Sequence, residues 1–268
     1  MDLKILADTP PWEWPVDTDQ MLLRILGDEQ QDESDRLLAA KLAGDYTVIN
    51  DELADRLLSM VLSHEESEPI RARAAISLGP ALAAVDMDMF EDPEEMPISI
   101  NTFHKIQTSL RDSYMDTHTP KEVRRRILEG SVRAPQDWHQ KAIREAYLSD
   151  DPDWHLTAVF SMEYVSGFHP EILEAFNSED ENIQYHAVRA SGSWEVQEAW
   201  PYILSLLTSG STEKELVLAA IEAAANIRPQ EIEDVLFDFD FILKSTVTGH
   251  ESVSDVIHLA IGNWNRHL

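Results

Sequence analysis

The stretch IRARAAISLGPAL, from Ile70 to Leu82, decides the fold of this chain. It is a helix-like run in which small residues stand where a neighbouring helix must come close. Gly79 lies near its end, and glycine suits a helix C-cap because it enters the left-handed region of the backbone without a Cβ clash. The run therefore predicts a helix that packs tightly against another helix and then stops.

Similar runs recur along the chain. They are DRLLAAKLAGD from Asp35, EVRRRILEGSVRA from Glu122, WHLTAVFSMEYVSG from Trp154, YHAVRASGSW from Tyr185 and LVLAAIEAAANI from Leu216. Five of the six runs end near a glycine, namely Gly44, Gly79, Gly130, Gly167 and Gly192. Their starts are about 30–37 residues apart, except for one step of about 52. Such a period is typical of stacked helix pairs.

A second helical stretch follows each run. The stretches are NDELADRLLSMVLS, TFHKIQTSLRDSY, WHQKAIREAYLSD, HPEILEAFNSED, AWPYILSLLTSG and PQEIEDVLFDFDF. Expected N-caps are Asn50, Thr102 and Asp137, and prolines are expected near helix starts at Pro170, Pro201 and Pro229. The acidic, proline-containing stretch from Asp86 to Ser99 accounts for the long step and is predicted to be a surface loop.

The order of a charged residue, Arg, Ala-Ala and Leu-Gly resembles HEAT repeats, in particular the short bacterial HEAT-like repeats shared with phycobilisome lyases. Ile70–Leu82 matches best, and Asp35–Asp45 matches next. The resemblance covers about residues 20 to 265. It implies an all-α fold, an α-solenoid in which antiparallel helix hairpins stack into a superhelix with second helices on the concave side.

We expect a single HEAT-like repeat domain over residues 1–268. An N-terminal strap and a capping helix occupy 1–34, with an amphipathic helix around Thr18–Gly27. Helical repeats occupy 35–250, and a C-terminal capping helix occupies 251–268. Terminal segments of a repeat array usually cover the apolar edge of its last repeats.

The composition narrows the classes of function. The formal net charge is −29, which disfavours nucleic acid and anionic membrane surfaces and favours basic protein partners. The alternative explanation of the charge is solubility or adaptation to a salty cytoplasm. No cysteine is present, so disulfides, cysteine-ligated zinc and thiol catalysis are excluded. We expect a soluble cytoplasmic protein, because no signal-peptide core and no membrane-spanning apolar run is found.

No catalytic or metal-binding motif is found. The histidines of the middle repeats, His139, His155, His169 and His186, lack the HxxxH or HExxH spacing of a metal site. Deoxyhypusine hydroxylases resemble this architecture but carry four His-Glu dyads, whereas only His64-Glu65 and His250-Glu251 occur here. The acidic loop fails as an EF-hand, because Glu91 replaces its glycine and Pro97 replaces its last glutamate. We therefore expect no cofactor and no metal.

The densest positive patch is KEVRRR, which contains Arg124, Arg125 and Arg126. It could bind an anion or a partner, together with Trp138 and His139. Alternatively, these arginines belong with Arg36, Arg71, Arg73 and Arg189 to a ladder of ion pairs between repeats, as HEAT-like families commonly use. Each such surface pair contributes only about 0–1 kcal/mol.

The segment PPWEWP, from Pro10 to Pro15, places Trp12 and Trp14 around one glutamate. Its prolines keep the chain extended, which suits a strap better than a helix. The two tryptophans could cover the edge of the first repeat or dock a partner.

The expected function is a non-enzymatic protein–protein interaction scaffold or adaptor. The alternative is a lyase-type or ligand-chaperone activity that uses the concave groove. Fold alone does not decide between them, because helical repeat arrays serve many functions.

Overall fold

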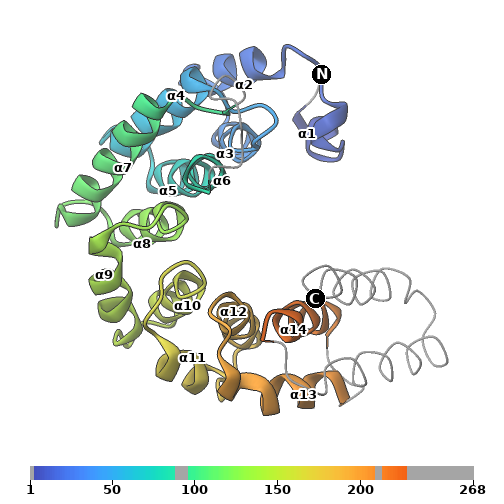
Figure 1. The fold of residues 1–268 in the computed structure, drawn as a ribbon. Coiled ribbons are helices and arrows are strands. Elements are labelled where there is room, and N and C mark those ends of the chain that lie inside the picture. Colours follow the sequence, from blue (N-terminus) through green and yellow to red (C-terminus); the bar gives the residue numbers. More distant parts are fainter. Residues whose placement is uncertain (1–2, 88–95, 209–212, 228–268) are drawn as a thin grey trace. The chain divides into compact units, whose positions relative to one another are not determined.

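The computed structural model of the chain describes residues 3–87, 96–208 and 213–227. These residues form α-helices and short 3-10 helices, and among them there is no strand (Figure 1). The prediction of an all-α fold is therefore confirmed. Backbone contacts divide the chain into two compact units, Met1–Ala142 and Ile143–Leu268. The single repeat domain over residues 1–268 stays a prediction.

The first unit is a stack of helix pairs. It begins with α1 (Leu3–Ala7), the 3-10 turn η1 (Pro11–Glu13) and α2 (Thr18–Gly27). The further helices are α3 (Glu33–Ala43), α4 (Asp51–Leu62), α5 (Glu68–Ser77), α7 (Ile100–Met115), α8 (Lys121–Ser131) and α9 (Asp137–Tyr147), which crosses the boundary between the units. Neighbouring helices pack in pairs, α2 with α3, α4 with α5 and α7 with α8. The short helix α6 (Gly79–Asp86) continues from α5. First helices pack on first helices, α3 on α5 and α5 on α8, while α4 packs on α7.

The second unit repeats this plan. It contains α10 (Pro152–Ser161), α11 (His169–Ala175), α12 (Glu181–Ser193), η3 (Gln197–Ala199), α13 (Trp200–Thr208) and α14 (Lys214–Ile227). Here α10 packs on α12, and α12 packs on α14. All six sequence runs thus lie in the first-helix rows, and the predicted stack of helix hairpins is confirmed within each unit.

The two rows of helices are placed opposite to the prediction, which had put the second helices on the concave side. In the first unit, Figure 1 shows α3, α5 and α8 on the inner side of the curve and α4 and α7 on its outer side. First helices, and not second helices, therefore line the inner side of that unit.

The repeat glycines serve helix contacts more than helix ends. Gly130 lies inside α8, and a Cβ built on it would stand 2.3 Å from the carbonyl oxygen of Ala75 in α5. Gly192 lies inside α12, where a Cβ would stand 2.8 Å from the Cα of Ala223 in α14. The C-cap prediction was wrong for both, because only the absence of a side chain lets these helices approach so closely. Of the described glycines, Gly167 alone has a positive φ, at 93°.

The predicted N-caps have mixed outcomes. Asn50 caps α4, since its side chain accepts the backbone N–H of Leu53 at 3.0 Å. The prediction of Thr102 as an N-cap was wrong, because the side chain of Ser99 caps α7 by accepting the backbone N–H of Thr102. Asp137 is the first residue inside α9 and not its cap.

Several predictions lie outside the described residues. They are the C-terminal capping helix at 251–268, the last second helix from Pro229, the His250-Glu251 dyad and the middle of the acidic loop. The predicted helix at Thr18–Gly27 coincides with α2. Within the described ranges, no helix combines the length and the apolar composition that crossing a membrane requires.

Candidate functional site

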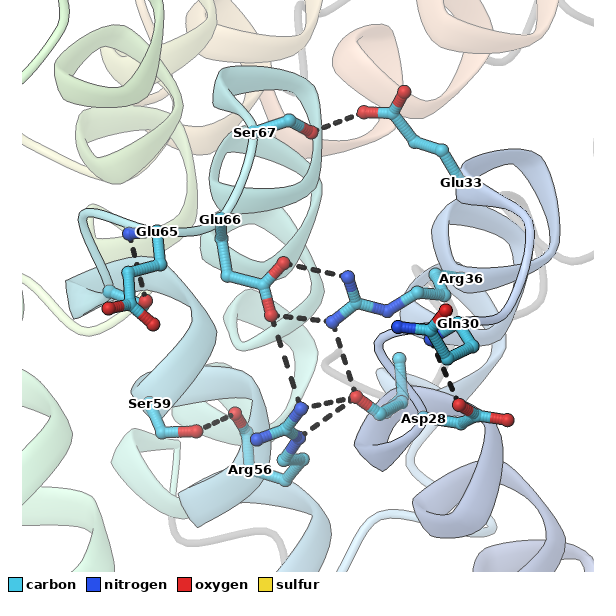
Figure 2. Close-up of polar contacts among 11 residues, drawn as sticks. Asp28, Gln30, Glu33, Arg36, Arg56, Ser59, Glu65, Glu66 and Ser67 are labelled. Atoms are coloured by element: carbon cyan, nitrogen blue, oxygen red, sulfur yellow. Dashed lines mark hydrogen bonds and ion pairs between the residues drawn. The ribbon is translucent and has the colours of Figure 1, made fainter.

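The most buried ionic cluster of the first unit joins Arg36, Arg56 and Glu66 (Figure 2). Glu66 precedes α5 and accepts from both terminal nitrogens of Arg36, at 2.8 and 2.5 Å. The carbonyl of Leu26, at the end of α2, accepts from Arg36 at 3.3 Å and from the Nε of Arg56 at 3.1 Å. The hydrogen bonds that Arg36 donates to Glu66 raise the pKa of Arg36 above its ordinary value. The cluster ties the end of α2 to α3, α4 and the start of α5, which is a stabilising role.

Other arginines bind helix ends instead of carboxylates. Arg71 donates through Nε to the carbonyl of Val61 at 2.9 Å, and Arg124 donates to the carbonyl of Tyr114 at 2.8 Å. The last carbonyls of a helix have no partner within it, so these cations satisfy them and also favour the negative end of the helix dipole. The predicted ladder is therefore only partly present in the first unit.

In the second unit, an inter-repeat ion pair does occur. Arg189 of α12 donates to Glu163, after α10, at 2.6 and 3.0 Å, and to Glu222 of α14 at 3.3 Å. These hydrogen bonds raise the pKa of Arg189, chiefly through Glu163. One guanidinium thus links three successive first-helix segments, as the ladder prediction requires.

The arginines of the KEVRRR cluster contact neighbouring groups of the chain itself. Arg124 lies over the ring of Tyr114 at 5.1 Å. Arg125 is buried and pairs with Glu122 at 2.8 Å, and Arg126 pairs with Glu122 at 2.8 Å and with Glu129 at 2.6 Å. Burial opposes ionisation of Glu122, but the hydrogen bonds from Arg125 and Arg126 outweigh it and hold its pKa below the ordinary value. A partner-binding role for these three arginines stays a prediction.

Trp138 and His139 fix the start of α9. The indole of Trp138 packs on Tyr114, with ring centroids 4.8 Å apart, and donates its N–H to Gln136 at 2.7 Å. His139 is fully buried, and its Nδ1 accepts the backbone N–H of Gln136 at 2.8 Å. Its Nε2 therefore carries the ring proton and donates to the hydroxyl of Ser131 at 3.0 Å. His139 is the third residue of α9, where a capping box has a glutamate that accepts the backbone N–H of the N-cap residue. Here the imidazole accepts that N–H from Gln136.

Burial lowers the pKa of His139 to about 4, so the ring is neutral near pH 7. The other histidines of the middle repeats do not converge. The Nδ1 of His155 donates its hydrogen to the carbonyl of Tyr147 at 3.0 Å, and His186 packs edge-on against Phe160. In the ranges that the structure describes, no group of three or more His, Asp or Glu side chains could hold a metal ion.

The two N-terminal tryptophans have different environments. Trp14 is half-buried and donates its indole N–H to the carbonyls of Leu6 and Thr9, at 3.0 and 2.8 Å. It fastens η1 to α1, a helix that the sequence analysis did not predict. Trp12 is 79% exposed. Trp14 therefore holds η1 against α1, whereas the side chain of Trp12 is exposed to solvent.

A groove of about 420 Å³ lies beside Trp12. We call it the Trp12 groove. It is lined by Pro11, Trp12, Trp14, Pro15, Val16, Thr18, Asp19, Thr47 and Val48. Asp19 is its only charged lining residue, and Asn50 donates to the Asp19 carboxylate at 3.0 Å. Sequence reasoning identified the tryptophans but missed Val16, Asp19 and Val48, because the η1–α2 connection, α2 and the α3–α4 connection bring them there.

A second groove, of about 630 Å³, lies over the first helices of the same unit. We call it the α5 groove. Leu37, Ala72 and Ile76 form its apolar part, and Glu68, Arg73, Glu122, Arg126 and Glu129 supply its charges. Among the residues that the structure describes, Arg73 has no hydrogen-bond or ion-pair partner. A third groove, in the second unit, is lined by Tyr185, His186 and several acidic residues.

Comparisons with known proteins do not assign a family to the chain. No protein-family model matches the chain, and no curated protein matches it in sequence. Among solved structures, YibA of Escherichia coli matches with a TM-score of 0.49 and 15% identity, over 96% of this chain and 84% of YibA. Kap121p matches with a TM-score of 0.47 and 14% identity, over 92% of this chain and 26% of Kap121p. The function therefore has to be argued from the sites themselves.

Proposed function

We propose that the chain is a cytoplasmic, non-enzymatic scaffold that binds a basic protein partner through the Trp12 groove. The observation that carries this proposal is the exposure of Trp12, 79%, beside a groove that prolines, valines and Trp14 line together with two threonines and Asp19. Tryptophan is strongly enriched among the residues that dominate protein–protein binding energy. An exposed tryptophan held next to a pocket is therefore a better binding element than a scattered surface apolar residue.

The frame around Trp12 supports binding because it is already ordered. The double hydrogen bond of Trp14 anchors η1, and Pro11 and Pro15 restrict the backbone on either side. A pre-ordered segment loses less conformational entropy when a partner binds, so more of the contact energy remains as affinity.

The charge of the chain supports a basic partner. The formal net charge is −29. A field of this sign accelerates encounter with cationic proteins and repels polyanions.

The proposal is tested by capture from the native lysate with three baits: the unaltered chain, Trp12→Ala and Leu148→Ala. Leu148 is 81% exposed in the second unit, so Leu148→Ala is a matched control for loss of an exposed apolar side chain. The supporting result is a basic protein that co-elutes stoichiometrically with the unaltered chain and with Leu148→Ala but not with Trp12→Ala. Equal recovery by all three baits, or no stoichiometric partner at low or high salt, contradicts the proposal.

The α5 groove favours a second candidate, the lyase-type or ligand-chaperone activity. Arg73 is available to a carboxylate there, next to the apolar side chains of Ala72 and Ile76. A linear tetrapyrrole has propionates and an extended apolar body that suit such a groove. Titration with a linear tetrapyrrole should then give absorbance changes that Arg73→Ala abolishes, and absence of any change excludes this candidate.

A further inference from the structure

We infer that the Trp12 groove recognises an arginine side chain on an extended segment of the partner. The inference rests on the proposed function and names the chemistry of the contact. It starts from the composition of the groove, which combines an exposed aromatic ring, aliphatic side chains and a single carboxylate. Each of these matches one part of an arginine side chain.

The aromatic ring matches the guanidinium. Trp12 is 79% exposed, so its indole is accessible to solvent. Tryptophan is the best aromatic partner for a cation, and the planar guanidinium stacks on a ring better than the compact ammonium of lysine does.

The carboxylate of Asp19 matches the positive charge. Its Oδ2 accepts a hydrogen bond from Asn50 at 3.0 Å and a longer one from Gln20 at 3.5 Å. Between Pro10 and Leu23 the chain contains three acidic residues, Glu13, Asp17 and Asp19, and no basic residue. A cation in the groove would therefore meet negative charge without competition from a neighbouring lysine or arginine of this segment.

The aliphatic side chains match the stem of the arginine. Val16 and Val48 line the groove with Pro11 and Pro15. Long cationic side chains bury their methylene stems on apolar surface while the charged head reaches a polar group. Trp12 lies in the 3-10 turn Pro11–Glu13, and the backbone is extended only at the flanking Pro10 and Trp14, with ψ of 139° and 146°.

The test uses the full chain and blocked pentapeptides of sequence Gly-Pro-X-Pro-Gly, in which X is arginine, lysine, citrulline or glutamate. The chain has seven tryptophans, so their indole N–H resonances can be followed individually in a ¹⁵N spectrum. Trp12→Phe assigns the resonance of Trp12. Citrulline keeps the shape of arginine without its charge and thus isolates the cation.

The arginine peptide should shift the Trp12 resonance at low salt with an affinity about tenfold above that of the citrulline peptide. Asp19→Asn should weaken the arginine peptide severalfold, whereas Asp150→Asn, a control in the second unit, should leave it unchanged. Equal shifts with arginine, citrulline and glutamate, or no shift at Trp12, overturn the inference. If partner capture still depends on Trp12 in that case, the scaffold proposal stands and only the arginine contact is wrong.

Discussion

Arg71 donates its Nε hydrogen to the backbone carbonyl of Val61 at 2.9 Å, across a chain separation of ten residues. The same separation joins Arg36 to Leu26 and Arg124 to Tyr114. In each case the arginine of a first helix reaches back to the end of the preceding helix. The recurring arginine therefore ties each of these first helices to the end of the helix that precedes it.

Replacing Arg71 by methionine should lower the free energy of unfolding by about 1–3 kcal/mol, because the buried carbonyl of Val61 loses its donor. Arg73→Met, two residues along α5, should change it by less than about 0.5 kcal/mol, since Arg73 has no partner among the described residues. Urea unfolding of both variants measures the difference. Equal losses would show that the hydrogen bond to Val61 is not the cause.

Gly130→Ala should destabilise the chain by about 1–3 kcal/mol, although alanine is the better helix former. The added Cβ would stand 2.3 Å from a backbone oxygen of α5, which cannot move as a flexible side chain can. Gly27→Ala is the matched control, because nothing lies within 4 Å of a Cβ at that helix end. Thermal unfolding should show a clear decrease for Gly130→Ala alone.

His139 should make the stability of the chain sensitive to mild acid. Its pKa is about 4 in the folded chain, below the ordinary 6.5, so the unfolded chain binds the proton more readily. Stability from this group is fully present above pH 6.5 and is lost as the pH falls toward 4, by about 3 kcal/mol in total.

The comparison is with His139→Gln, which keeps an acceptor for the N–H of Gln136 but does not titrate. The free energy of unfolding of the unaltered chain should decrease relative to this variant between pH 6.5 and 4. His169→Gln, at an exposed position, should follow the unaltered chain. Parallel pH profiles for the unaltered chain and His139→Gln would contradict the assignment.

Substitutions of Trp12 and of Trp14 should have different effects on hydrogen exchange in the N-terminal segment. Trp14→Phe removes the indole N–H shared by Leu6 and Thr9, so amides of residues 4–9 should exchange with solvent faster. Trp12→Phe should leave their exchange unchanged, because its ring is mostly exposed. Hydrogen exchange by mass spectrometry on an N-terminal peptide distinguishes the two variants.

The sequence predicted the helix rows well because the repeat period depends on local pattern. The runs beginning at Asp35, Ile70 and Glu122 all became first helices. The pattern could not distinguish a glycine at a helix end from one at a helix contact, since both follow an apolar run. Gly130 belongs to the second kind because α5, 55 residues earlier at Ala75, approaches it.

The candidate site was harder to predict for the same reason. Trp12 and Trp14 have nearly the same local sequence, and only the carbonyls of Leu6 and Thr9 make one of them a strap. Whether an arginine meets a carboxylate or a carbonyl likewise depends on loop geometry, as Arg36 and Arg71 show. The hydrogen-bond partner of such a side chain is set by the tertiary structure and cannot be predicted from the spacing of residues in the sequence.

The exposure of Trp12 also makes it an optical probe of its own surroundings. Its emission should be the most accessible to dissolved quenchers among the tryptophans whose exposure the structure describes. Because Glu13, Asp17 and Asp19 surround it in the chain, caesium ions should concentrate near the indole while iodide is depleted. The ratio of quenching by these two ions would then report when a bound segment covers the ring and neutralises the charge beside it.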